Sequence, residues 1–230
     1  MAKMHLKRFA TPRTWKIKRK GIVFISRPDP GAHTKNLSIP INIVLKDMLK
    51  CARTTVEVKK LLNLNEVLVD WRRVKEHCFP VGLMDTIYIK PLGQHFRITF
   101  DGKGKLTAVS IDANEAKLKL CKIIGKTLLK GGKTQLNLSD SRNIIVEKDG
   151  YKVGDSVLIE LPSQKISGQF KLEKGAAVLL VSGKHIAESG VVEKAGVNVV
   201  VYKNEKGEIN TTSRKYAFVI GKEKPSIRIK

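Results

Sequence analysis

The fold of this chain is decided by residues 39–89, IPINIVLKDMLKCARTTVEVKKLLNLNEVLVDWRRVKEHCFPVGLMDTIYI. Apolar residues recur at helical spacing from Ile41 to Cys51 and again after the threonine pair at residues 54–55, which can cap a second helix. Short β-type runs follow at Val67–Asp70 and Thr86–Ile89. The segment therefore predicts two short helices packed on a small sheet.

The residues before it, 1–40, are strongly basic and predict an extended segment rather than a packed domain. Asp29 is their only acidic residue, and aromatic side chains are interleaved with the cations. This pattern suits a segment laid against a polyanion that offers stacking faces, and we expect that polyanion to be RNA. The residues of this segment expected to contact RNA are Lys3, Lys7, Arg8, Phe9, Arg13, Trp15, Lys16, Lys18, Arg19, Lys20, Arg27, His33 and Lys35.

Two details of the basic segment lead to further expectations. The apolar run at residues 22–25 can anchor the segment against the neighbouring domains, so we expect it to be ordered when bound. Ser38–Pro40 predicts the start of the first helix, because proline is tolerated in a first helical turn. Phe9 and Trp15 are expected either to stack on RNA or to pack on the protein itself.

From Pro91 to about Phe170 the chain predicts a β domain. Short alternating runs are separated by Gly-containing turns, and Gln94–Phe100 with Lys105–Ile111 predicts a hairpin. The fold class expected for the whole chain is therefore α+β and multidomain.

Residues 174–192 predict a strand, an exposed loop bounded by Gly183 and Gly190, and a second strand. Glycine permits tight backbone turns, so these two residues are expected to shape the loop. The loop would direct Lys184 and His185 towards a partner.

The overall charge points to a polyanionic partner. The 230 residues, 42% of them hydrophobic, can hold one large domain or two to three small ones. A net charge of +23 and a pI near 10.0 exceed what solubility requires and imply nucleic acid, or less readily an anionic membrane. No apolar run approaches the roughly 18–20 residues of a spanning helix, and the basic N-terminus lacks the apolar core of a secretory signal. We expect a cytoplasmic protein with no membrane partner.

Residue patterns that carry catalytic or metal chemistry are sparse. Cys51, Cys78 and Cys121 are widely separated and odd in number, which argues against a disulfide framework and against a Cys-x-x-Cys metal site. His77 beside Cys78 could form a nucleophile or metal pair, but adjacent side chains point in different directions. We expect no catalytic residue, metal, cofactor or small-molecule substrate.

Two parts of the chain resemble known RNA-associated modules. Residues 41–89 resemble the small RNA-binding module named after bacterial ribosomal protein S4, through the Ala52-Arg53 pair and the run Pro80–Ile87. Residues 174–192 resemble the Kyrpides–Ouzounis–Woese motif of ribosomal proteins and transcription elongation factors, although Ala176 replaces its acidic residue and Ile186-Ala187 replaces its Lys-Gly pair. A second RNA-contacting face is expected at Arg53, Lys59, Lys60, Arg72, Arg73 and Lys75.

The order of these parts behind a basic N-terminus resembles the S4e family of small-subunit ribosomal proteins of archaea and eukaryotes. The sharpest match is at the N-terminus, in His5–Arg8, Pro12, Trp15, Gly21 and Arg27–His33. The resemblance implies a non-catalytic structural constituent of the small ribosomal subunit, with rRNA and neighbouring ribosomal proteins as partners. The expected division is a basic N-terminal extension at 1–40, the S4-type RNA-binding module at 41–90, a central β domain at 91–170, a small β-barrel with the glycine-bounded loop motif at 171–221, and a flexible basic tail at 222–230.

Two alternative functions use the same RNA-binding modules. An RNA-modifying enzyme such as a pseudouridine synthase would need a catalytic aspartate within an Arg-Leu-Asp stretch, which the chain lacks, and Asp101 and Asp140 lie in turn-forming contexts. A transcription or translation factor would use the terminal barrel to bind protein, but such factors usually carry less charge. The ribosomal interpretation predicts that removing Met1–Lys35 abolishes association with the small subunit.

Overall fold

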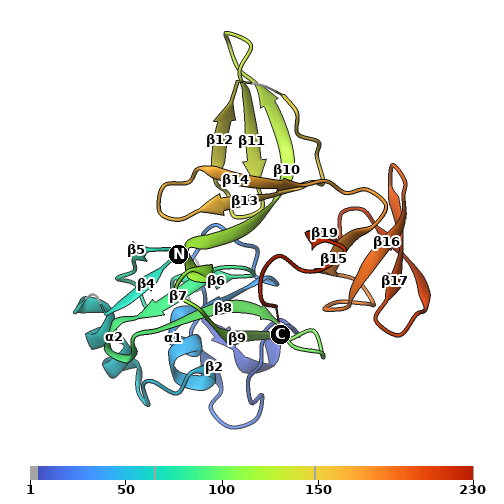
Figure 1. Cartoon of the computed structure of the whole chain (residues 1–230). Coiled ribbons are helices and arrows are strands. Elements are labelled where there is room, and N and C mark those ends of the chain that lie inside the picture. The colour runs from blue at the N-terminus through green and yellow to red at the C-terminus, as the bar shows by residue number, and fades with distance from the viewer. Residues whose placement is uncertain (1–4, 65, 148, 230) are drawn as a thin grey trace. The chain divides into compact units, whose positions relative to one another are not determined.

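The computed structural model describes residues 5–64, 66–147 and 149–229, and it is mostly β structure with few helices (Figure 1). The chain separates into two compact units. Among the described residues, the first unit comprises 5–64, 66–101 and 105–116, and the second comprises 102–104, 117–147 and 149–229. The chain thus contains both helices and strands, as the expected α+β class requires, and strands predominate.

The first unit is built on a five-stranded antiparallel sheet in the order β5-β4-β7-β8-β9. Its strands are β4 (Val67–Val69), β5 (Arg72–Arg73), β7 (Thr86–Ile89), β8 (Gln94–Phe100) and β9 (Leu106–Ile111). The predicted hairpin is present as β8 and β9. The domain boundary expected after residue 90 falls inside this sheet, because β7 pairs with β8 across the short 3-10 turn η3 (Lys90–Leu92).

Both predicted helices are present in the first unit. The first is α1 (Ile41–Ile43), which continues as the π-helical turn η2 (Val44–Met48). The second, α2 (Thr55–Asn63), starts at the Thr54 cap.

The start of α2 is a reciprocal cap. The Thr54 hydroxyl accepts the amide of Glu57 at 3.2 Å, and the Glu57 carboxylate accepts the amide of Arg53 at 2.8 Å. These bonds satisfy amide donors that the first turn of a helix leaves unpaired. Val58 and Leu62, on the inner face of α2, are fully buried.

The expected helix start at Ser38–Pro40 is wrong. These residues form strand β3, which pairs with β6 (Pro80–Gly82) in a two-stranded ladder. Pro40 has φ −62° and ψ 141°, so it is the last extended residue before the helix. The pairing partner lies far along the chain, and a local sequence pattern does not show such a non-local ladder.

A buried arginine fixes the end of the first unit. Arg97 of β8 is 0% exposed and donates from Nη2 to the Glu115 carbonyl at 2.8 Å, at the start of the 3-10 turn η4 (Glu115–Lys117). Its Nη1 lies 3.4 Å from the Glu115 carboxylate. Burial lowers the pKa of Arg97, and Glu115 opposes that shift.

The first sheet of the second unit has the order β12-β11-β10-β13-β14. Its strands are β10 (Leu118–Leu128), β11 (Thr134–Leu138), β12 (Asn143–Val146), β13 (Ser156–Glu160) and β14 (Ile166–Phe170). One face is apolar and buried around Ile123, Leu136 and Val157.

The second sheet of this unit has the order β18-β17-β16-β15-β19. Its strands are β15 (Ala176–Leu180), β16 (Ser189–Ala195), β17 (Val199–Asn204), β18 (Ile209–Ser213) and β19 (Ala217–Lys222). Val178, Val200 and Val219 lie at the centre of its core.

A lysine of β10 clamps the turn between β18 and β19. The Nζ of Lys122 donates to the carbonyls of Arg214 at 3.0 Å, Lys215 at 2.9 Å and Ala217 at 2.6 Å. An ammonium group has three donors, and here each one has a backbone acceptor. Burial lowers the pKa of Lys122 to about 8, and the nearby charge of Arg214 acts in the same direction.

Residues 222–230 were expected to form a flexible arm, and the structure corrects this for the residues that it describes, 222–229. Ser226 donates from both its amide and its hydroxyl to the Ile220 carbonyl, at 2.9 and 2.8 Å. Ile227 and Ile229 are 4% and 7% exposed. The apolar residues alternating with the cations of this tail favour packing over a solvated arm.

Candidate nucleic-acid interface

The N-terminal segment is fixed to the first unit by Trp15. Its side chain is 1% exposed, and Nε1 donates to the Ser38 carbonyl at 2.8 Å. Its backbone forms a β-bridge with Leu106 of β9, whose amide donates to the Thr14 carbonyl at 2.6 Å. Of the two roles expected for Trp15, packing on the protein is the one seen, and a buried indole has no face for an RNA base.

Arg19 holds the turn that follows strand β1 (Leu6–Lys7). This turn, η1 (Arg8–Ala10), is closed by donation from Arg19 Nη1 to the Thr11 carbonyl at 3.2 Å and from Nη2 to the Pro12 carbonyl at 3.0 Å. The guanidinium of Arg19 thus has a structural role in addition to the phosphate contact expected for it.

The ring of His33 is turned inward, which corrects its place among the expected RNA contacts. Its Nε2 lies 2.9 Å from the Asp85 carboxylate, and the two side chains are 7% and 4% exposed. Asp85 also accepts the amide of Gly82 at 2.7 Å. A Cβ on Gly82 would stand 2.2 Å from the His33 ring, so glycine at this position lets the ring lie against the backbone of β6.

Most cations of the segment extend outward from this anchored backbone. Arg8 is half-buried and donates to the Lys18 carbonyl at 2.8 Å, and Lys3 lies outside the described residues. The exposed cations are Lys7, Arg13, Lys16, Lys18, Lys20, Arg27 and Lys35. A fixed backbone with exposed Lys and Arg side chains is the arrangement that phosphate contacts require.

The expected anchoring by residues 22–25 is wrong. Strand β2 (Phe24–Ile25) pairs with β1, yet Ile22, Val23 and Phe24 are 73%, 59% and 52% exposed. A ribbon of two strands buries little of either face, and here Leu6 and Ile25 take the shielded positions. Phe9 is 74% exposed, so an apolar surface lies among the exposed cations.

The second expected face is exposed as well. Its members lie before α2, on α2 and on or after β5, and all of them are exposed: Arg53, Lys59, Lys60, Arg72, Arg73 and Lys75. Arg73 also donates to the Asn63 carbonyl at 3.3 Å, which links β5 to the end of α2.

The turn that leads into β5 is strained. Asp70 and Trp71 have φ of 49° and 61°, in the left-handed region that non-glycine residues rarely adopt. Asp70 accepts the amide of Thr86 at 2.9 Å, and Trp71 Nε1 donates to the Ala116 carbonyl at 3.1 Å. These bonds fix the turn and present the basic strand β5 at the edge of the sheet.

An aromatic stack beside this turn was not predicted. Tyr88 and His95 are paired residues on β7 and β8 with ring centroids 4.4 Å apart, and Trp71 lies 5.8 Å from each of them. Burial lowers the pKa of His95, which favours a neutral ring. Knowing the register of the β7–β8 pair would have allowed this stack to be predicted, because it places Tyr88 opposite His95.

The loop between β15 and β16 has a fixed base. His185 Nδ1 lies 2.9 Å from Oε1 of Glu188, whose Oε2 accepts the hydroxyl of Tyr202 at 2.8 Å. Burial would raise the pKa of Glu188, but the bonds from His185 and Tyr202 outweigh it and lower that pKa. His185 is therefore engaged within the loop, and Lys184 is exposed.

The two loop glycines have different physical roles. Gly183 has φ 93°, and a Cβ there would stand 3.3 Å from the ring of Tyr216. Gly190 lies within β16 rather than in a turn, and a Cβ there would stand 2.3 Å from the Lys203 carbonyl oxygen. The expectation that Gly190 makes a tight turn is therefore corrected, because its requirement is close strand approach.

The His77–Cys78 pair lacks the features of an activated nucleophile. The Cys78 Sγ lies 3.5 Å from His77 Nε2, but burial and the charges of Asp29 and Glu76 raise the pKa of the thiol. Among the described residues, no group of three His, Cys, Asp or Glu side chains could hold a metal ion. Within the described ranges, no helix is both long and apolar enough to cross a membrane.

Comparisons with known proteins cover nearly the whole chain. Residues 92–166 match the model of ribosomal family S4e, and residues 2–36 match the RS4NT (NUC023) domain. The small ribosomal subunit protein eS4 of Methanosphaera stadtmanae is 43% identical, over 99% of this chain and 96% of that protein. The eS4 protein of Methanocaldococcus jannaschii is 38% identical, over 99% and 98%.

A solved structure shares the fold. The crystal structure of the 30S ribosomal protein S4e from Thermoplasma acidophilum matches with a TM-score of 0.71 and 29% identity, covering 82% of this chain and 97% of that chain. The shared fold and the named relatives define a class, the ribosomal proteins. Within that class, this chain belongs to the S4e family of ribosomal proteins, also called eS4.

Proposed function

We propose that this chain is a structural constituent of the small ribosomal subunit and binds its rRNA through two cationic faces of the first unit. The carrying observation is the N-terminal segment, whose backbone is fixed by Trp15 and His33 while its lysines point outward. Because the backbone is already fixed, binding folded RNA costs less backbone conformational entropy than it would for a disordered segment. The relatives named above support the location, since their names place them in the small ribosomal subunit.

The second face supports the same assignment. Residues 41–90 would act as the S4-type RNA-binding module, with the basic residues of α2 and β5 contacting phosphates. The strained turn at Asp70 and Trp71 fits this role, because backbone strain is retained where geometry matters for function.

The loop between β15 and β16, residues 181–188, would act as a Kyrpides–Ouzounis–Woese-type element in the small β-barrel. Lys184 is its exposed cation, and the pairing of His185 with Glu188 holds the loop in place. This loop would make a smaller contribution to RNA binding than the N-terminal segment.

The protein acts by binding, with no reaction of its own, in the cytoplasm as part of the ribosome. Its partners would be small-subunit rRNA and neighbouring ribosomal proteins. The matching relatives are named as ribosomal proteins, and a raised thiol pKa at Cys78 is opposite to what a nucleophile needs.

The proposal is tested by a charge-removal variant that keeps Trp15, Arg19 and His33. Lys7, Lys16, Lys18 and Lys20 are changed to Ala and compared with a matched variant in which Lys130, Lys174, Lys194 and Lys206 are changed to Ala. Sedimentation of reconstituted small subunits through increasing salt should release the first variant well before the matched one. Equal retention of both variants, or release of the unmodified protein at moderate salt as expected of a factor, would overturn the proposal.

A further inference from the structure

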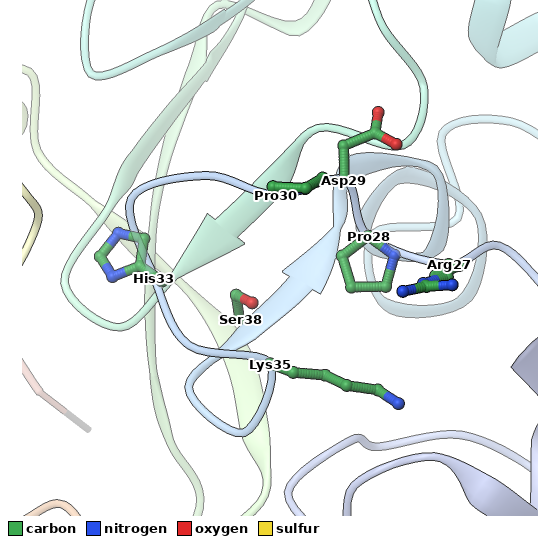
Figure 2. Close-up of a pocket in the computed structure, with 7 residues that line it drawn as sticks. All are labelled: Arg27, Pro28, Asp29, Pro30, His33, Lys35 and Ser38. Carbon is green, nitrogen blue, oxygen red and sulfur yellow. The ribbon is translucent and has the colours of Figure 1, made fainter. Parts of the chain in front are cut away.

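A small cavity lies where the basic segment passes strand β3. It measures about 180 Å³. Its lining residues are Arg27, Pro28, Asp29, Pro30, His33, Lys35 and Ser38. Figure 2 shows Arg27 and Lys35 extending to the same side of the loop, with the Asp29 carboxylate pointing away from them.

The loop that forms this cavity is held in place by contacts with residues 78–85. The Asp29 amide donates to the Cys78 carbonyl at 3.0 Å. A Cβ on Gly31 would stand 2.5 Å from Cγ of Pro80, so the loop lies directly on β6. The His33 ring is bonded to Asp85, which fixes the far end of the loop.

The walls of the cavity combine two chemistries. Arg27 and Lys35 supply cations, and Arg27 can donate to two oxygens of one phosphate. Pro28 and Pro30 supply rigid apolar rings that suit the carbon skeleton of a sugar. Two fixed prolines also mean that little entropy is lost when a ligand enters.

The size of the cavity restricts the ligand. Pockets that enclose drug-sized ligands usually measure about 300–1,000 Å³, so this cavity suits a smaller group. A phosphate with its adjoining ribose is of the right size and matches both the cations and the proline rings.

We propose that this cavity is a subsite for one sugar–phosphate unit of an RNA strand, with the phosphate at Arg27 and Lys35 and the ribose against Pro28 and Pro30. The proposal rests on the RNA-binding function proposed above and deepens it. A subsite of this kind fixes the register of the RNA along the segment, whereas the exposed lysines give affinity with little positional preference.

The test uses the full chain bound to small-subunit rRNA and hydroxyl-radical footprinting of the RNA backbone. The variant R27A with K35A is compared with the matched variant K194A with K206A, which removes the same charge from the second unit. The first variant should lose protection of one or two adjacent riboses and bind roughly tenfold or more weakly. The matched variant should keep every protected position.

A second variant tests the shape of the cavity with all charges kept. Gly31→Ala forces the loop away from Pro80, so the same riboses should lose protection, and the melting temperature is measured alongside to separate this local shift from unfolding. Gly102→Ala, at a position with open space around it, is its control.

The outcomes separate the two proposals. Unchanged footprints in both pocket variants, or a uniform weakening equal to that of the matched variant, would overturn the subsite and leave the proposed function standing. Pocket variants that keep the RNA footprint but lose a neighbouring ribosomal protein would assign the cavity to a protein and overturn the subsite. Absence of any footprint with the unmodified protein would overturn the proposed function as well.

Discussion

The N-terminal segment of the first unit presents several exposed cations and the loop at residues 181–188 of the second unit presents one, Lys184, but the main anchors of the two regions differ in kind. The segment is anchored by a buried neutral indole, Trp15, and at its far end by the His33–Asp85 pair. The loop depends on ionisable groups: Glu188 binds His185 and Tyr202. It also packs on the turn that Lys122 clamps, since the Val181 amide donates to the Tyr216 carbonyl at 3.0 Å.

This difference teaches that the density of charge in a sequence does not tell how the charge is supported. A neutral anchor should be insensitive to pH, whereas an ionisable clamp should not. The following predictions test that contrast, from the largest effect to the smallest.

Trp15→Ala should give the largest loss of stability. The change leaves a cavity and an unpaired Ser38 carbonyl, so the first unit should lose about 3–5 kcal/mol of unfolding free energy. Urea unfolding measures this, with Phe9→Ala as the control for an exposed aromatic residue, expected to change stability by less than about 0.5 kcal/mol. Equal losses of unfolding free energy in the two variants would show that Trp15 does not anchor the segment.

Lys122 should make the second unit more stable as pH rises. Its pKa of about 8 in the folded chain lies below the ordinary lysine value of about 10.4, so between these values the unfolded chain binds a proton that the folded chain does not. The unfolding free energy of the unmodified protein, relative to Lys122→Met, should therefore rise by about 2 kcal/mol from pH 8 to pH 10.

Urea unfolding of both proteins across this pH range provides the measurement. The difference in unfolding free energy between the unmodified protein and Trp15→Ala, measured in the same series, should not change with pH. If the difference between the unmodified protein and Lys122→Met does not change with pH, the Lys122 ammonium group keeps its proton in the folded chain over this range.

Lys18→Ala with Lys20→Ala should weaken RNA binding. Each phosphate contact contributes about 0.7–0.9 to the slope of log K against log salt, so the slope should fall by about 1.5 and the affinity by roughly tenfold at physiological salt. Filter binding to small-subunit rRNA at several salt concentrations measures both quantities. Lys184→Ala, in the other region, should lower the slope by less than about 1, and a larger effect there would reverse the ranking of the two surfaces.

Tyr202→Phe should destabilise the second unit modestly. The change removes the bond from the hydroxyl to Glu188 while keeping the buried ring, so about 1 kcal/mol should be lost. Thermal unfolding reports the loss. Tyr216→Phe, at a ring that is 39% exposed, is the control and should leave stability nearly unchanged.

Ala187→Gly should give the smallest change, and a favourable one. Ala187 has φ 71°, where a Cβ costs about 1–2 kcal/mol, while glycine loses about 0.5–1 kcal/mol more backbone entropy on folding. The net gain should be about 0.5 kcal/mol. Ala195→Gly, in β16, lacks this strain and should be destabilising, so a gain in both variants would point to another cause.

Several elements could be predicted from the sequence because their signals are local. The cap at Thr54 with Glu57, the helical spacing after Ile41 and the β8–β9 hairpin depend on neighbours a few residues apart. The class of partner also followed from composition, since a net charge of +23 needs counter-charge.

Other features could not be predicted because they depend on residues distant in the chain. Trp15 is buried by partners near Ser38 and Leu106, and His33 is turned inward by Asp85. The cavity beside Arg27 exists because β3 pairs with β6, where the local pattern indicated a helix start. The sequence showed these residues as cations, aromatics and a histidine, and the tertiary contacts decided which of them face outward.

The bridge between Trp15 and Leu106 also has a consequence for synthesis. In a chain made from its N-terminus, the basic segment emerges before its anchor on β9, which follows only after many further residues. Throughout that interval the segment is an unanchored polycation beside a ribosome made of RNA, and long-range closure is intrinsically slow. Until the β8–β9 hairpin has emerged, the cations of the segment therefore lack the Trp15 anchor that fixes their backbone in the folded chain.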